Sequence, residues 1–97
     1  STYVLHQNYP NPFNPATHLA FELPHSGFVE LTIYDVLGRE VKTLVRQQLP
    51  PGYHTVQWDG TDATGRTVGG GVYVVRLTVG QAPSQSFTAT RKIILLR

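Results

Sequence analysis

The stretch THLAFELPHSGFVELTIY, residues 17–34, decides the fold because apolar and polar residues alternate along both of its halves. The first half puts three apolar residues on one face: Leu19, Phe21 and Leu23. The second half does the same with Val29, Leu31 and Ile33. A period of two is typical of strands with one buried face. The turn formers PHSG, residues 24–27, separate the halves and predict a hairpin.

The same alternation continues on both sides of this stretch. Further strands are expected at residues 40–45, 53–58, 72–79 and 86–97, with 2–5 as an additional candidate. Turns are expected at residues 49–52, 59–66 and 80–84, the second of them as a tight connection. The pattern predicts an all-β chain that forms one antiparallel β-sandwich of about six to seven strands.

Two local features refine this prediction. Gly38 can adopt the left-handed conformation that closes a short hairpin loop after residue 34. Leu44 breaks the parity of Val41 and Val45, which indicates a bulge or an edge position in that strand.

Composition predicts one folded domain without a disulfide, because the 97 residues are 40% hydrophobic and include no Cys. No apolar run approaches the roughly 20 residues that cross a membrane, so no transmembrane segment is expected. The start, STYVLHQ, has neither an initiator Met nor a signal peptide. We therefore expect the chain to be a fragment of a larger protein, whose own targeting segment would lie upstream.

Charge is distributed unevenly along the chain. All eight Lys and Arg lie at or after Arg39, and no acidic residue follows Asp62. Either a basic face is neutralised by Glu22, Glu30 and Asp35, or a basic surface awaits an anionic partner. The last third supplies Arg66, Arg76, Arg91, Lys92 and Arg97. These residues form no run and alternate with no stacking aromatics, so no nucleic-acid partner is expected.

The chain offers little catalytic chemistry. It has no Cys, its Ser residues fall in turns, at a terminus or at a strand start, and its four His residues lack zinc-ligand spacing. His54 shares a strand face with Val56 and Trp58, which favours a position at the rim of the core. We expect neither an enzyme nor a bound cofactor.

Two weaker kinds of site remain as alternatives. Asp59 and Asp62 lie in a Gly-bearing loop that invites calcium, but the loop lacks the alternating oxygens of an EF-hand and favours turn capping. Six aromatic residues could line a carbohydrate platform, although their parities favour the core. These are Tyr3, Tyr9, Phe13, Tyr53, Trp58 and Tyr73.

QNYPNPFNP, residues 7–15, can form neither a helix nor a central strand, because proline fixes φ and lacks an amide hydrogen. Asn side chains can replace the missing backbone bonds, and Tyr9 and Phe13 can fill apolar gaps at the open end of the sandwich. The segment is therefore interpreted as a stiff structural latch made of Tyr9, Pro10, Asn11, Pro12, Phe13, Asn14 and Pro15.

Six blocks in order resemble a known family: QNYPNPFNPAT, FELP, IYDVLGREV, QWDGTDATGRTV, GGGVYVVRL and TRKIILLR. The chain resembles the type A C-terminal sorting domain of type IX secretion substrates. It is also similar to the immunoglobulin-like domain of the flagellar hook-capping protein. The resemblance implies an immunoglobulin-like sandwich over residues 7–97. Residues 1–6 would be the end of a linker or a first edge strand.

The resemblance also implies partners and a location. An N-terminal cargo domain in the same chain would pass through the periplasm to the cell surface or medium of a Bacteroidetes-like bacterium. The outer-membrane type IX secretion machinery and its processing protease would recognise this domain. The family's recognition blocks fall on Gly71, Tyr73, Val74, Val75, Lys92, Ile93, Ile94, Leu95, Leu96 and Arg97.

The terminal IILLR is apolar on both faces, which suits a strand covered by its own domain or one that pairs with another protein. The alternative function is a structural immunoglobulin-like module: a spacer, a carbohydrate-binding accessory or a hook-cap-like assembly domain.

Overall fold

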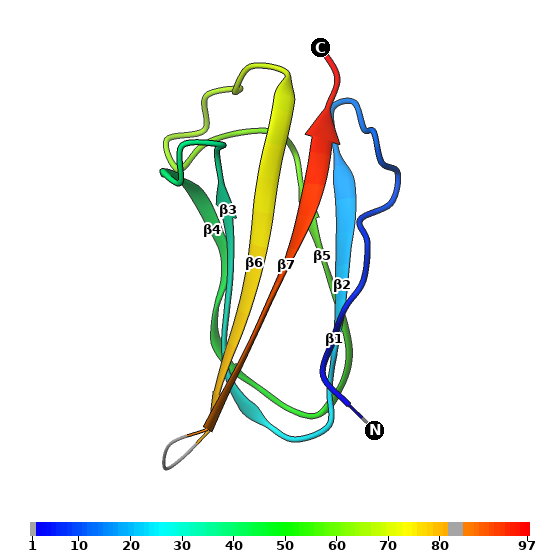
Figure 1. Cartoon of the computed structure of the whole chain (residues 1–97), viewed down its shortest axis with the longest axis vertical. Coiled ribbons are helices and arrows are strands. Elements are labelled where there is room, and N and C mark those ends of the chain that lie inside the picture. The colour runs from blue at the N-terminus through cyan, green and yellow to red at the C-terminus, as the bar shows by residue number, and fades with distance from the viewer. Residues whose placement is uncertain (1, 82–84) are drawn as a thin grey trace.

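The computed structural model describes residues 2–81 and 85–97, and it places seven strands in two facing sheets (Figure 1). One sheet has the order β1-β2-β5, the other β4-β3-β6-β7, and every neighbouring pair is antiparallel. The strands are β1 Val4–Leu5, β2 Thr17–Leu23, β3 Gly27–Tyr34, β4 Glu40–Leu49, β5 Gly52–Trp58, β6 Gly71–Gln81 and β7 Gln85–Leu95. The predicted antiparallel sandwich is confirmed. Most of the predicted turn at 80–84 lies outside the described residues.

The predicted hairpin around residues 24–27 is wrong. β2 and β3 belong to different sheets, so this turn carries the chain across the sandwich. Each strand has one apolar face, and these faces bury one another only when the strands oppose each other across the core. β2 instead pairs with β1 and β5, whereas β3 pairs with β4 and β6.

The irregular β4 strand has both features that the sequence indicated. The β3–β4 register moves from Leu31↔Val45 to Thr32↔Thr43, which leaves Leu44 as the extra residue of a bulge. β4 also lies at the edge of its sheet, and it extends beyond the predicted residue 45 to Leu49. Gly38 closes the β3–β4 loop with φ of 83°, as predicted.

The connection after β5 is longer than the tight turn that we expected at residues 59–66. It runs from residue 59 to residue 70 and joins β5 of one sheet to β6 of the other. Only Asp62–Arg66 forms a tight turn, flanked by a bridge between Thr61 and Thr67. β7 ends at Leu95, two residues before the predicted end of the last strand.

The core fills an elongated sandwich with principal extents of 41 × 23 × 20 Å. An aromatic cluster closes one end, where the ring of Trp58 lies 5.7 Å from that of Phe13 and 5.4 Å from that of Tyr73. At the rim, His54 stacks on Phe21, as its parity predicted. The buried apolar residues are Leu5, Phe13, Leu19, Phe21, Leu23, Val29, Leu31, Ile33, Trp58, Tyr73, Val75, Leu77, Val79, Ile93 and Leu95.

Candidate functional site

The two predicted recognition blocks lie side by side on β6 and β7. Their register pairs Gly71 with Leu95, Tyr73 with Ile93, and Val74 with Lys92. They occupy the end of the sandwich where β7 finishes, at the top of Figure 1. The fold therefore brings together two segments that are about twenty residues apart in the sequence.

The alternation of the strands divides these residues between the core and the outer face. Tyr73, Val75, Ile93 and Leu95 are buried in the core. Val74, Lys92 and Ile94 belong to the opposite parity, and the adjoining Leu96 is 52% exposed. Together with the exposed Gly71 and Arg97, this second group is positioned to meet another molecule.

Tyr73 is held in place by a polar contact as well as by packing. Its hydroxyl donates to the carbonyl of Gly69 at 2.6 Å, and burial raises the pKa of the phenol.

Arg97 binds the long connection between β5 and β6. Its guanidinium donates to the carbonyls of Val68 and Gly60 at 2.6 and 3.0 Å. Gly60 has φ of 77°, and a Cβ there would lie 2.8 Å from an Arg97 guanidinium nitrogen and 3.1 Å from the carbonyl oxygen of Pro15. The positive φ and the close Pro15 carbonyl therefore favour glycine at this crossing of three segments.

The proline-rich latch forms hydrogen bonds along the free edge of β7. The Phe13 amide donates to the Ile94 carbonyl at 2.9 Å, and the Leu96 amide donates to the Phe13 carbonyl at 2.8 Å. The Ile94 amide donates to Asn11 Oδ1 at 3.1 Å. The backbone groups that another strand would need at this end of β7 are therefore engaged within the domain.

The latch is fixed from inside by Asn8, which is only 3% exposed. Its side-chain amide donates to the carbonyl of Pro10 and to Thr17 Oγ1. Phe13 fills the core as predicted, but the prediction for Tyr9 is wrong, because its side chain is 79% exposed. Two backbone bonds between Tyr9 and His18 make Tyr9 part of a sheet edge, and its ring points to solvent.

Asp59 and Asp62 cap separate turns, as the loop composition favoured. Asp59 Oδ1 accepts hydrogen bonds from the amide and hydroxyl of Thr61, and Asp62 Oδ1 accepts them from those of Thr64. In each case the threonine hydroxyl bond is the main cause that lowers the pKa of the carboxyl. Within residues 2–81 and 85–97, no three His, Cys, Asp or Glu side chains gather as metal ligands.

The turn at Asp62 has a second copy that the sequence analysis missed. DVLGR at residues 35–39 and DATGR at residues 62–66 share the pattern D-x-x-G-R. In both, the aspartate Oδ1 accepts from the arginine amide, and the glycine amide donates to the aspartate carbonyl. Asp35 likewise has a lowered pKa, chiefly because of the Arg39 amide.

Among the described residues, Glu22, Glu30 and Asp35 form no ion pair with the basic residues of the last third of the chain, which corrects the first interpretation of the charge pattern. Glu22, Glu30 and Asp35 pair instead with His6, Arg46 and Arg39. Arg91 and Arg97 donate to backbone carbonyls.

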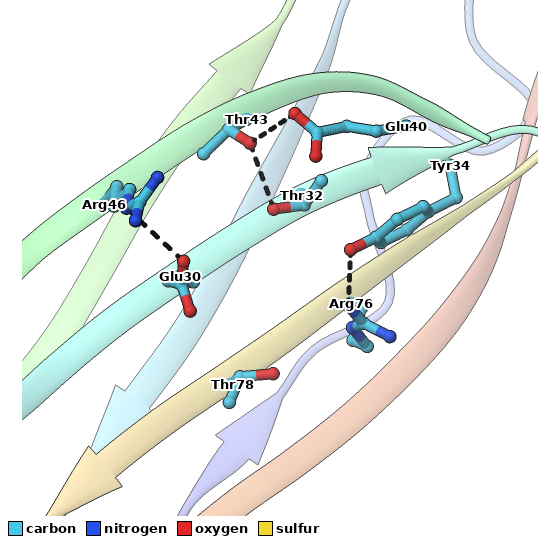
Figure 2. Close-up of a pocket in the computed structure, with 8 residues that line it drawn as sticks. All are labelled: Glu30, Thr32, Tyr34, Glu40, Thr43, Arg46, Arg76 and Thr78. Carbon is cyan, nitrogen blue, oxygen red and sulfur yellow. Dashed lines mark hydrogen bonds and ion pairs between the residues drawn. The ribbon is translucent and has the colours of Figure 1, made fainter. Parts of the chain in front are cut away.

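A polar depression on the outer face of the four-stranded sheet was also missed (Figure 2). It has a volume of about 120 Å³. Arg46 lies 3.5 Å from Glu30, Thr43 bonds Thr32 and Glu40, and Arg76 bonds the Tyr34 hydroxyl while it stacks on the ring. The sequence signal for this depression was the row of polar residues at even-numbered positions of β3 and β6. These side chains form hydrogen bonds and ion pairs with one another, so the depression is a polar network on the outer face of the sheet. Its lining comprises Glu30, Thr32, Tyr34, Glu40, Thr43, Arg46, Arg76 and Thr78.

No helix in the described part of the chain has the length and apolar character needed to cross a membrane.

Three solved structures share this fold at 22–23% sequence identity. PorU of Porphyromonas gingivalis, solved as a latent dimer, has a TM-score of 0.75 and is 22% identical, over 97% of this chain and 9% of PorU. PorZ of the same organism, described as a surface component of the type IX secretion system, has a TM-score of 0.59 at 22% identity, over 96% of this chain and 11% of PorZ. FlgD of Xanthomonas campestris has a TM-score of 0.68 at 23% identity, over 95% of this chain and 67% of that chain.

Sequence comparison gives a higher identity to a FlgD protein than these structures show. The basal-body rod modification protein FlgD of Salmonella typhimurium is 40% identical over 57 residues, which are 59% of this chain and 25% of FlgD. This chain therefore corresponds to about a quarter of the length of that relative. The model of the FlgD Ig-like domain family matches residues 10–82, from the latch to the end of β6. The chain belongs to the FlgD Ig-like domain family.

Proposed function

We propose that this domain is a sorting signal that directs an attached cargo protein through a type IX outer-membrane translocon. It acts by being recognised, and it catalyses no reaction. The recognised surface consists of the outward members of the two blocks, Val74, Lys92, Ile94 and Leu96. Tyr73, Val75, Ile93 and Leu95 support that surface from the core.

The observation that carries the proposal is the pairing of the two blocks on β6 and β7. Their outward side chains form one short surface, mostly aliphatic and basic at Lys92, at a single end of the sandwich. The similarity of fold to domains of PorU and PorZ supports a secretion context. The partners under this proposal are the translocon, its processing protease and the N-terminal cargo, and the location is the cell surface or the medium.

A reporter fusion tests the proposal directly. Residues 1–97 are fused to the C-terminus of a periplasmic reporter and expressed in a host with the translocon. We expect the reporter at the cell surface or in the medium. Retention in the periplasm, with the domain folded as judged by protease resistance, would refute the proposal.

The structure also dictates which variants are informative. Deletion of residues 92–97 removes Ile93 and Leu95 from the core, so loss of export would not separate recognition from unfolding. Lys92→Glu changes an exposed side chain, and Thr88→Glu is the matched control on the same face of β7. Export should fail for Lys92→Glu and persist for Thr88→Glu. Equal export of both would remove Lys92 from the recognised surface.

A structural module in a larger assembly is the second candidate. The match to the FlgD Ig-like domain favours it, as does the relative that is named for basal-body rod modification. This function predicts a stable domain that leaves the location of the reporter unchanged. The parent gene decides between them: a catalytic domain and a signal peptide upstream favour sorting, whereas a flagellar operon favours the module.

A further inference from the structure

Three of the four sheet edges carry a recognised protection against pairing with another strand. β1 has only two residues. β4 contains the bulge at Leu44 and carries Glu40, Lys42 and Arg46. β7 carries Arg91 and Lys92, and the latch is bonded to its last residues. Short length, bulges, charge and cover are the means by which proteins block edge pairing.

The fourth edge, β5, has none of these protections. Residues Gly52–Trp58 contain no charged side chain and no proline. Their pairing with β2 runs without a register shift from Leu23↔Gly52 to Thr17↔Trp58. β5 is therefore a regular, uncharged edge of seven residues.

Backbone geometry shows which groups of β5 face outward. His18 exchanges hydrogen bonds with Tyr9, and the Ala20 carbonyl accepts from His6, all on the far side of β2. In an antiparallel strand, the N–H and C=O of one residue point to the same side, and neighbours point to opposite sides. The cross-strand partners of His18 and Ala20, which are Gln57 and Thr55, therefore point away from β2. Tyr53 does the same by alternation.

A groove lined by both polar and apolar side chains adjoins this edge. It lies between β5 and β4, has a volume of about 270 Å³, and its polar lining includes Arg46 and Gln47. Its aliphatic lining comprises Leu44, Val45, Leu49 and Val56. These side chains are only partly buried in the domain. A strand or domain placed against β5 would cover them.

We propose that β5 pairs with β5 of a second copy of this chain, antiparallel, about a two-fold axis at Thr55. Thr55 then exchanges both backbone bonds with Thr55 of the second copy, and Tyr53 exchanges both with Gln57 of the second copy. The second Tyr53–Gln57 pair follows by symmetry. Every outward N–H and C=O of these three residues is satisfied.

The side chains of β5 suit this self-pairing. His54 lies opposite Val56 of the second copy on the core side, where the two grooves meet. Threonine faces threonine and tyrosine faces glutamine on the outer side, and no like charges oppose one another. A two-fold arrangement demands such self-complementarity, whereas a foreign strand does not. The paired domains form one continuous sheet in the order β1-β2-β5-β5-β2-β1.

Sedimentation equilibrium of the whole chain over a wide concentration range tests the proposal. We expect the mass to rise from the 10.8 kDa of one chain toward twice that value. Thr55→Lys places two lysines directly opposite each other and should weaken association at least about tenfold. Thr88→Lys, on an exposed position of β7, should leave it unchanged. An equimolar mixture of Thr55→Lys and Thr55→Glu should restore dimers.

Amide hydrogen exchange of the unmodified protein gives a second measurement that no substitution disturbs. Amides of Tyr53, Thr55 and Gln57 should exchange slowly at high concentration and rapidly on dilution, while Val56 stays protected in both. A single-chain mass at all concentrations overturns the proposal. So does a dimer that Thr55→Lys and Thr88→Lys weaken equally, or one in which these three amides remain unprotected.

Discussion

Replacement of Phe13 by alanine tests whether the latch holds the sandwich together. The Phe13 side chain is 1% exposed, and its ring lies 5.7 Å from that of Trp58 in the aromatic cluster. Truncation of a fully buried phenylalanine costs roughly 3–5 kcal/mol, because apolar contact is lost and a cavity remains. A domain of this size has a total stability of about 5–15 kcal/mol, so the loss is a large share of it.

Tyr9→Ala is the matched control, because it removes an aromatic ring from the same segment. Tyr9 is 79% exposed, and its structural bonds to His18 are made by the backbone, which alanine retains. We expect a change within about 0.5 kcal/mol, as for most surface substitutions. Both variants thus replace an aromatic side chain by alanine, but the side chain is buried in one case and exposed in the other.

Urea unfolding measures the free energy of unfolding of both variants. It is monitored by circular dichroism and by the fluorescence of Trp58, the one tryptophan in the chain. Thermal unfolding adds a second measurement: at 4–8 °C per kcal/mol for a domain of this length, Phe13→Ala should lower Tm by roughly 12 °C or more. Circular dichroism is needed because Phe13 contacts the fluorophore. Equal losses for the two variants, or a loss below about 1 kcal/mol for Phe13→Ala, would refute the reasoning.

Three further predictions follow from local contacts. Asn8→Ala should cost about 1–3 kcal/mol, because it removes two hydrogen bonds worth roughly 0.5–1.5 kcal/mol each from a buried site, although the Thr17 hydroxyl still donates to the Pro10 carbonyl. The exposed Asn14→Ala should be neutral in the same unfolding assay. Gly60→Ala should destabilise the domain more than Gly65→Ala. Both glycines have positive φ, which costs alanine about 1–2 kcal/mol, but only at Gly60 would the added Cβ also approach Arg97 and Pro15. Equal losses of Tm would contradict this prediction. Asp35 and Asp62 have pKa values below the ordinary 3.8, so their turns add stability above that pH and lose it as pH falls through the lowered values. Carbon-detected NMR titration of both carboxyls checks this, and midpoints at or above 3.8 would contradict the described turns.

Alternation along the strands carried most of the fold prediction. The buried faces of β2, β3 and β6 and the bulge at Leu44 follow from parity, because a strand has only two faces. Parity does not say which sheet a strand joins. Parity therefore predicts a hairpin at residues 24–27, although the apolar faces of β2 and β3 oppose each other across the core.

The site was less predictable for the same reason. The sequence marks residues 71–75 and 92–97, and parity separates the outward Val74 from the buried Tyr73. Only the register of β6 and β7 places Val74 beside Lys92 and Tyr73 beside Ile93. Contacts between distant segments, such as Phe13 with Ile94 or Arg97 with Gly60, leave no local signal. Proline content indicated a stiff segment but did not indicate which strand it would bind.

The bonds between the latch and β7 have a consequence for the order in which the chain can fold. They join residues more than eighty positions apart, such as Asn11 with Ile94 and Gln7 with Lys92. Contacts of such long range form late, because closing the intervening chain costs entropy before any bond is gained. During synthesis, the latch has no strand to bind until residues 92–96 have left the ribosome. A chain that ends before residues 92–96 leaves Phe13 without its backbone partners. The latch can therefore bind in place only after the last strand of the domain has been synthesised.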